Sequence, residues 1–202
     1  VRNTLRWPDR YNGLSSAYRT LHINTSKDVT RFHDLPFDDE VQAFPDHYDM
    51  HSYLVKYADH FGVTPLIRFN TPVANVTPEF TPGKEKPIWR VETNGGASET
   101  FDSVIVASGH LHVPRHIPMF RDEFTGTYLH SHYYKEPDSF VGKRICIVGV
   151  GNSACDISGD LCATAKRCVL VARSGVLILP KLLFGRPFTS ISSKLQKPWI
   201  PY

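Results

Sequence analysis

The chain has 202 residues, with 23 lysines and arginines against 20 aspartates and glutamates, so its formal net charge is only +3. Neither sign of charge forms a long run, which argues against a surface that binds nucleic acid. No apolar stretch approaches the roughly 20 residues that cross a bilayer, so no membrane segment is expected in this chain.

The first helix is predicted only after a long irregular segment. Residues 1–45 predict loops, because turn-forming residues recur there with little helical or strand periodicity. From Asp49 the apolar residues fall on one helix face, and Gly62 stands where such a helix would stop. The residues of this face are Met50, Tyr53, Leu54, Tyr57, Ala58 and Phe61. The sequence therefore predicts a helix over residues 49–61.

Short strands are predicted next. Residues 66–69, 72–76 and 88–93 carry strand-forming residues, and the sequence Asn-Gly-Gly at 94–96 predicts a turn after the last of them. Residues 101–107 are more apolar and predict a buried strand. A helix, a small meander and a buried strand in this order are typical of the latter part of a large dinucleotide-binding domain.

The most informative segment spans residues 144–157 and reads R-I-C-I-V-G-V-G-N-S-A-C-D-I. Gly149 permits a tight turn, Gly151 lets backbone amides approach a phosphate, and Ala154 occupies the third small position of a G-x-G-x-x-A pattern. The pattern predicts a site for the pyrophosphate of a dinucleotide at the start of a helix. The expected cofactor-binding residues of this turn are Gly149, Gly151, Asn152, Ser153 and Ala154.

The context of this turn strengthens the prediction. Residues 145–148 form an apolar run suited to a parallel strand, and a helix is expected to begin near Ser153. A second apolar run at 168–172 completes a β-α-β unit.

Arg173 and Ser174 stand where the residues that distinguish the two nicotinamide cofactors belong, 24 and 25 positions after Gly149. An acidic side chain there would bind the ribose 2′-hydroxyl of NAD, whereas an arginine would receive the 2′-phosphate of NADP. No Asp or Glu occurs between Lys166 and Arg186. The sequence therefore favours NADPH, although a solvated cation at a strand end would give the same pattern.

These elements together predict an α/β fold with two Rossmann-like dinucleotide-binding domains in series. Residues 1–141 would form the latter part of the first domain and the linker, and residues 142–202 the first part of the second. Both would be incomplete, because no first strand or start methionine opens the chain and only about sixty residues follow position 142. We therefore expect an internal fragment of a longer protein. Two nucleotides in one protein suggest electron transfer from a nicotinamide to a flavin.

Four cysteines lie at positions expected inside strands or helices, and they are Cys146, Cys155, Cys162 and Cys168. They predict buried, reduced thiols and a cytoplasmic location. No metal site is expected, because His47 and His51 have no third ligand near them in the sequence.

A second motif precedes the glycine turn. The segment at 124–134 reads F-T-G-T-Y-L-H-S-H-Y-Y and fits F-x-G-x-x-x-H-x-x-x-[Y/F], with matches at Phe124, Gly126, His130 and Tyr134. The pairing of this motif with the glycine turn, 15 positions after Tyr134, resembles the class B flavoprotein monooxygenases. The final tyrosine and the sequence N-T-S-K at 24–27 are similar to flavin-containing monooxygenases rather than to Baeyer-Villiger enzymes. The likeness runs from about residue 20 to about residue 175.

The resemblance implies an enzyme that binds FAD, in its first domain, and NADPH, in its second. Such an enzyme forms a C4a-hydroperoxyflavin with dioxygen and oxygenates soft nitrogen- or sulfur-containing small molecules. Asn24 matches the asparagine beside the flavin ring and is the candidate catalytic residue, since an amide donates and accepts hydrogen bonds without a titrating charge. His130 and Tyr134 would couple NADPH binding to the domain arrangement. The family's first glycine motif, which binds the FAD pyrophosphate, has no match in this chain.

Other interpretations stay open. The chain could belong to a Baeyer-Villiger monooxygenase that acts on ketones, or to a nucleotide-binding or redox module without oxygenase activity. Asn24 could instead form an Asx turn or a helix cap, and His130 could be a structural hydrogen-bonding residue. The oligomeric state and the substrate are not indicated by the sequence.

Overall fold

The computed structural model describes residues 15–109, 111, 113–189 and 191. Contacts divide the chain into two compact units, of which one comprises residues 55–110 and the other the rest of the described residues. This division does not test the expected domain boundary between residues 141 and 142, which stays a prediction. Within the described residues, no helix combines the length and the apolar character needed to cross a membrane.

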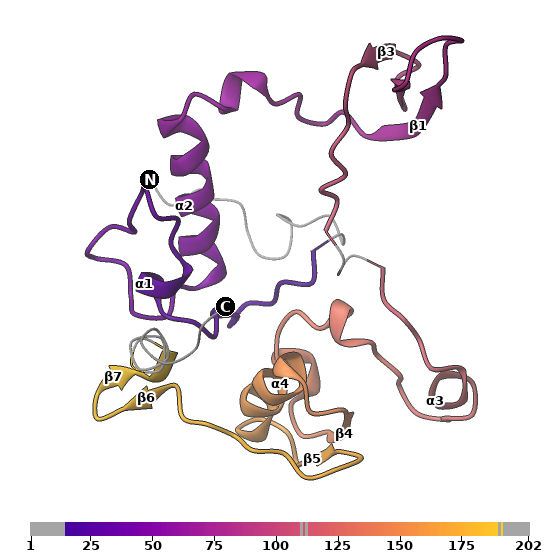
Figure 1. Ribbon diagram of the computed structural model, residues 1–202. Coiled ribbons are helices and arrows are strands. Elements are labelled where there is room, and N and C mark those ends of the chain that lie inside the picture. Colours follow the sequence, from indigo (N-terminus) through magenta and orange to yellow (C-terminus); the bar gives the residue numbers. More distant parts are fainter. Residues whose placement is uncertain (1–14, 110, 112, 190, 192–202) are drawn as a thin grey trace. The chain divides into compact units, whose positions relative to one another are not determined.

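The predicted β-α-β unit is confirmed (Figure 1). Strands β4 (Arg144–Val148) and β5 (Arg167–Val171) pair in parallel, and α4 (Asn152–Cys162) connects them. The helix begins one residue before the expected Ser153, with Gly151 as its N-cap residue. Because the connecting helix returns the chain to the same end of the sheet, both strands end at one edge.

An apolar core lies between α4 and one face of this strand pair. Its most buried members are Ile157 and Leu161 of α4, with Tyr18 and Tyr134 from two other segments. Leu161 is 1% exposed and Tyr134 is 2% exposed. Burial of each such side chain contributes about 1.5–3 kcal/mol. The cluster therefore joins α4 to two segments that are distant in sequence. Half-buried residues around it are Leu21, Phe140, Ile145, Ile147 and Cys168.

The expectation of four buried thiols is wrong. Cys146 and Cys162 are exposed, whereas Cys155 and Cys168 are half-buried, and all four are free thiols. Successive side chains of a strand point to opposite faces, so Cys146 points away from the face on which Ile145 and Ile147 pack.

The predicted central helix is α2 (His47–His60). Asp46 caps it, since its Oδ1 accepts hydrogen bonds of 2.8 Å from the backbone N–H groups of Tyr48 and Asp49. The carboxylate of Asp49 accepts in return from the N–H of Asp46 at 3.2 Å, which is a capping box. Gly62 ends the helix with a φ of +66°, as its position in the sequence predicts.

The loop before α2 packs on this helix through Tyr53. The Tyr53 ring stacks on Phe37 with centroids 3.9 Å apart, and both side chains are buried. The Tyr53 hydroxyl donates to the carbonyl of Leu35 at 2.7 Å and accepts from the N–H of Phe32 at 2.8 Å. Residues 15–45 are otherwise irregular, as predicted, apart from the short α1 (Lys27–Thr30). The predicted loops at residues 1–14 lie outside the described residues.

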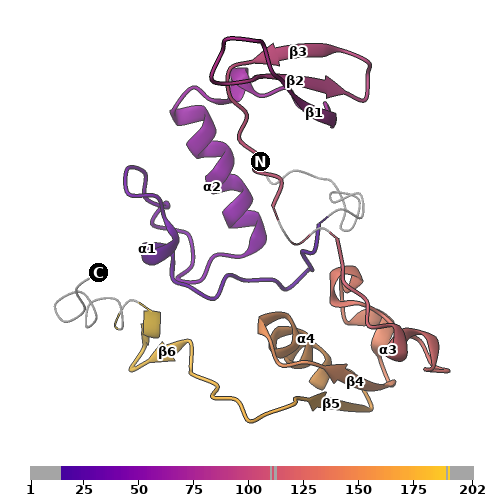
Figure 2. The ribbon, with the colours of Figure 1, turned by 45° about the vertical axis from the view of Figure 1, so that its right-hand side comes forward.

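The meander is an antiparallel sheet of three strands in the order β1-β2-β3 (Figure 2). Its strands are β1 (Val73–Glu79), β2 (Ile88–Thr93) and β3 (Ser98–Phe101). The prediction for β2 is confirmed, and β1 runs three residues beyond the predicted end at position 76.

Two strand predictions are wrong. Residues 66–69 form no strand, and Leu66 instead ends a 3-10 helix over Thr64–Leu66 with Pro65 in its first turn. The predicted buried strand at 101–107 ends at Phe101, and Ile105 is 90% exposed. An apolar strand of this kind needs neighbouring strands to pair with, and the described residues supply none beside it.

The remaining elements are short. They are α3 (Pro118–Asp122), the 3-10 helices Ser131–Tyr133 and Asp138–Phe140, and the hairpin of β6 (Leu182–Leu183) and β7 (Arg186–Pro187).

Candidate functional site

The turn after β4 depends on glycine at position 149. Gly149 has a φ of +113°, a conformation that L side chains rarely adopt. Its N–H donates to the carbonyl of Val171 at 2.8 Å, so the turn starts against the end of β5. The backbone geometry therefore explains the first glycine of the motif.

The N-terminus of α4 is open at position 151. Gly151 has a φ of −73° and a ψ of 178°, and a Cβ added there would meet no atom within 4 Å. The first intrahelical bond runs from the N–H of Cys155 to the carbonyl of Gly151. The three amides before it, at residues 152–154, have no partner within the helix. They carry the positive end of the helix dipole and could hold a phosphate.

Arg173 and Ser174 follow β5 at the same edge. Val148 pairs with Val171 at the ends of the two parallel strands, so the glycine turn and Arg173 leave the sheet on one side. The Arg173 side chain is exposed and forms no ion pair among the residues the structure describes. The structure thus brings a guanidinium, a hydroxyl and an open helix N-terminus to one edge of the sheet.

Asn24 lies in the segment between the bridge of His22 with Asp46 and the start of α1. Its side chain is exposed, and no hydrogen bond to it occurs in the described part of the chain. The N-cap residue of α1 is Ser26, so Asn24 does not cap this helix. Its amide remains available to a ligand.

Lys27 fixes the loop that follows Asn24. Its ammonium group donates to the carbonyls of Asp38, Asp39 and Val41, at 3.2, 3.0 and 2.7 Å. Its own N–H donates to the carbonyl of Ala43 at 2.9 Å. The lysine of the N-T-S-K sequence therefore organises backbone in this structure.

His130 is the N-cap residue of the 3-10 helix Ser131–Tyr133. Its Nδ1 accepts a hydrogen bond from the N–H of His132 at 3.1 Å, which requires an unprotonated nitrogen. Partial burial, followed by the nearby His116 and His132, lowers the pKa of His130. The geometry favours the structural interpretation of this histidine over an acid or base. A role in NADPH binding stays a prediction.

Tyr134 is buried between α4 and the segment at 18–20. Its hydroxyl donates to the carboxylate of Asp160 at 2.8 Å, and its ring contacts Tyr18 edge to face at 5.7 Å. Burial is the main cause that raises the pKa of Tyr134, and the Asp160 carboxylate raises it further. The phenol therefore stays neutral and donates its proton in a hydrogen bond.

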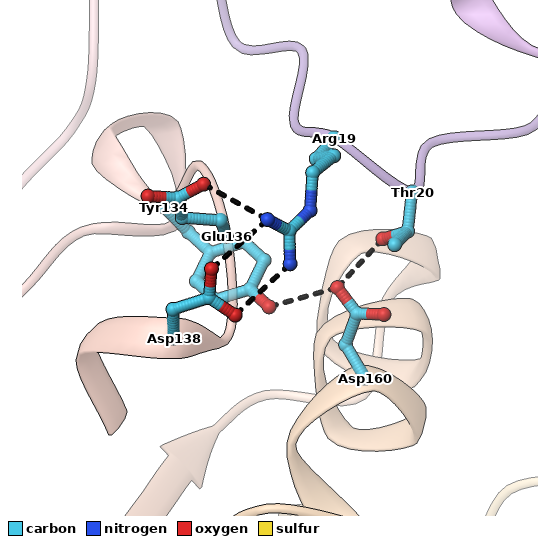
Figure 3. A network of polar contacts seen from close by, with 6 residues as sticks. All are labelled: Arg19, Thr20, Tyr134, Glu136, Asp138 and Asp160. Carbon is cyan, nitrogen blue, oxygen red and sulfur yellow. Dashed lines mark hydrogen bonds and ion pairs between the residues drawn. The ribbon is translucent and has the colours of Figure 1, made fainter. Parts of the chain in front are cut away.

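The network around Tyr134 was not foreseen from the sequence (Figure 3). Arg19 forms ion pairs with Asp138 at 3.0 Å and Glu136 at 3.2 Å, and Thr20 donates to Asp160 at 2.6 Å. A second tyrosine, Tyr18, donates to Asp156 at 2.8 Å. The available signal was the spacing of Asp156 and Asp160, four residues apart on one helix face. Their partners lie more than 20 positions away, so no local pattern identifies them.

Comparison with known sequences decides the family. The sequence profile described as "Flavin-binding monooxygenase-like" matches residues 7–194. The chain belongs to this family. It is 36% identical over 179 residues to a flavin-containing monooxygenase 5 of Cavia porcellus, covering 84% of this chain and 33% of that protein. It is also 36% identical to a dimethylaniline monooxygenase [N-oxide-forming] 4 of Mus musculus, covering 91% and 34%.

Solved structures agree with this assignment. The S-allyl-L-cysteine S-oxygenase of Allium sativum superposes with a TM-score of 0.70 at 31% identity, covering 85% of this chain and 40% of that one. A cyclohexanone monooxygenase of Rhodococcus sp. Phi1 bound to NADP+ reaches a TM-score of 0.60 at 21% identity, covering 91% and 35%, and shares the fold. The predicted α/β fold of the Rossmann type is thereby confirmed. The chain spans about a third of the length of the curated relatives it matches.

Proposed function

We propose that the whole protein is an NADPH- and FAD-dependent monooxygenase that uses dioxygen to oxygenate a soft nitrogen- or sulfur-containing small molecule. One observation carries this proposal for the chain itself. A glycine turn, an open helix N-terminus and Arg173 share one edge of a parallel strand pair in a member of the flavin-binding monooxygenase-like family.

The nicotinamide cofactor would bind at this edge. Its pyrophosphate would accept hydrogen bonds from the amides of Asn152, Ser153 and Ala154, next to the space left by Gly151. The guanidinium of Arg173 and the hydroxyl of Ser174 would bind the 2′-phosphate. An arginine favours this group because its charge and its several N–H donors match a phosphate.

Asn24 is the residue of this chain that we assign to the oxygenation step. FAD, when bound, would supply the oxygen chemistry as a C4a-hydroperoxyflavin. The exposed amide of Asn24 can donate a hydrogen bond to a nearby oxygen without releasing a proton. Such a donor would hold cofactor and oxygen in place without promoting loss of peroxide.

The substrate class rests on the relatives. One is named for N-oxide formation and another for S-oxygenation of S-allyl-L-cysteine. Both names describe oxygen transfer to a soft nucleophilic atom. We extend this class of acceptor to the present protein.

The test is to mix the full-length protein with NADPH in aerated buffer and follow the flavin absorbance. We expect bleaching, then a long-lived oxygenated-flavin band that decays faster when an amine or a thioether is added. Immediate return of the oxidised spectrum with stoichiometric hydrogen peroxide would contradict the proposal. A ketone that alone accelerates the decay would favour Baeyer-Villiger chemistry instead.

A further inference from the structure

One carboxylate oxygen binds two segments that lie far apart in the sequence (Figure 3). The Oδ2 atom of Asp160 accepts hydrogen bonds from the Tyr134 hydroxyl at 2.8 Å and from the Thr20 hydroxyl at 2.6 Å. Asp160 belongs to α4, whereas Thr20 and Tyr134 belong to neither this helix nor its strands. The carboxylate therefore ties both segments to the helix that opens at Gly151.

Burial and the charge of the carboxylate strengthen these hydrogen bonds. Tyr134 is 2% exposed, and Asp160 is half-buried. Hydrogen bonds to an ionised acceptor are shorter and about twice as strong as those between neutral groups. The Tyr134 bond is partly buried, whereas the Thr20 bond is exposed beside a recess of about 290 Å³ that Thr20 and Asp160 line in part.

The contacts continue from Thr20 to Asn24. The N–H of His47 donates to the carbonyl of Leu21 at 3.1 Å, and the N–H of Ile23 donates to the carbonyl of Pro45 at 2.9 Å. Thr20 is thus the last hydroxyl anchor on α4 before a short, backbone-paired segment that ends at Asn24. Because these bonds join residues 21–23 to residues 45–47, the Thr20 hydrogen bond ties the paired segments, and Asn24 with them, to α4.

We propose that Asp160 is a positioning residue that sets where Asn24 lies relative to the N-terminus of α4. It does so by accepting the Thr20 and Tyr134 hydroxyls on one oxygen. The catalytic part of this inference rests on the proposed function, whereas the anchoring part does not. Asp160 touches neither of the residues we assign to phosphate binding and acts through the segments it anchors.

The first measurement needs no cofactor. Hydrogen exchange of peptides covering residues 15–24 is compared between the full-length wild type and three variants. We expect Asp160→Ala to raise the exchange rate at least about tenfold, because two hydrogen bonds to a charged acceptor are lost. Asp160→Asn keeps an oxygen that accepts both hydroxyls but loses the charge, so it should raise the exchange rate by a smaller factor than Asp160→Ala. The control Asp122→Ala removes the same charge from an exposed ion pair and should change nothing.

The second measurement compares the rate of flavin reduction by NADPH with the fraction of NADPH that ends as hydrogen peroxide. Asp160→Ala should leave the rate of flavin reduction by NADPH within about threefold, because Gly149, Gly151 and Arg173 are unchanged. The fraction of NADPH converted to hydrogen peroxide should rise about fivefold in Asp160→Ala and by a smaller factor in Asp160→Asn. A general loss of structure would instead slow flavin reduction as well as raise peroxide release.

The outcomes separate the two proposals. Unchanged exchange in Asp160→Ala, or equal losses in Asp160→Ala and Asp160→Asn, would overturn the anchoring role. If the wild type forms no oxygenated flavin, the proposed function fails while the exchange data still decide the anchor. If Asp160→Ala does not fold, Thr20→Val and Tyr134→Phe carry the same test, because each removes one donor at nearly constant shape. We expect each to raise exchange by a smaller factor than Asp160→Ala.

Discussion

The β4-α4-β5 unit and the segment that carries Asn24 encode their structures in different ways. In the first, the site consists of backbone, and a dozen consecutive residues determine the turn, the helix start and the open N-terminus. In the second, an irregular chain is held by distant partners, such as the carbonyls that bind Lys27 and the ring of Tyr53 that binds Phe37. The comparison teaches that a phosphate site can be identified locally, whereas a loop that positions one amide cannot.

The largest expected effect comes from a substitution in the glycine turn, where the site consists of backbone. Gly149→Ala forces a side chain into a φ of +113° and should reduce the free energy of unfolding by about 1–3 kcal/mol, together with NADPH affinity. Gly151→Ser is the matched control, because its φ of −73° suits any residue and serine caps helices well. This variant should retain stability and lose only NADPH binding. Urea unfolding and NADPH titration of the full-length protein measure both quantities. Equal stability of the two variants would contradict the strained turn.

The next effect concerns the side chain at the same edge. Arg173→Ala should weaken NADPH binding about tenfold to a hundredfold, since a charge-assisted hydrogen bond contributes roughly 1.5–3 kcal/mol. NADH binding should hardly change, because NADH has no 2′-phosphate. Arg167→Ala removes the same charge from the opposite end of β5 and serves as the control. Equal losses of affinity for NADPH and NADH in Arg173→Ala would contradict the assignment of NADP specificity.

A third effect tests how Tyr53 holds the loop before α2. Tyr53→Phe leaves the N–H of Phe32 and the carbonyl of Leu35 without the hydroxyl they bind, at a cost of about 1–2 kcal/mol in the free energy of unfolding. Tyr133→Phe is the control, because Tyr133 is 48% exposed. The urea midpoint should fall for Tyr53→Phe and stay constant for Tyr133→Phe. A constant midpoint in both would mean that this loop is held by other contacts.

A smaller effect is expected from substitution of Asn24, the candidate catalytic residue in this loop. Asn24→Ala removes one neutral hydrogen-bond donor, worth about 1 kcal/mol, so peroxide release per NADPH should rise about fivefold. The rate of flavin reduction should not change, and neither should the urea midpoint, since Asn24 is exposed. Stopped-flow reduction and a peroxide assay distinguish the two steps. Unchanged coupling of NADPH use to product would remove Asn24 from the proposed mechanism.

The predictions made from the sequence follow the same division. The strand, turn and helix around Gly149 were predicted to within one residue, because strand periodicity, glycine and helix capping act over short distances. The strand at 101–107 was predicted wrongly, since an apolar run specifies burial only when neighbouring strands are present to cover it. The thiols were predicted wrongly because residue type gives the average burial of cysteine and not the face of the strand on which Cys146 lies.

The candidate site was predictable to the extent that it is local. The residues of the glycine turn and Arg173 could be chosen from spacing, and Asn24 only from a resemblance. Neither spacing nor resemblance identified Asp160 and Thr20, because their hydrogen bond joins positions 140 residues apart. Long-range polar pairs of this kind leave no periodic signal in one sequence.

The smallest effect concerns how the titration of His130 makes stability depend on pH. Because burial lowers the pKa of His130 in the folded protein, the unfolded chain takes up a proton first as the pH falls through about 6.5. Stability from this group is therefore complete above about pH 6.5 and is lost as the pH falls through the lower, folded-state pKa. His130→Asn keeps an N-cap acceptor for the N–H of His132 and cannot titrate. Its melting temperature should fall less than that of wild type between pH 7.5 and 5.5. Parallel pH profiles for the two proteins would show that the half-buried His130 does not resist protonation, and its structural role would lose its electrostatic basis.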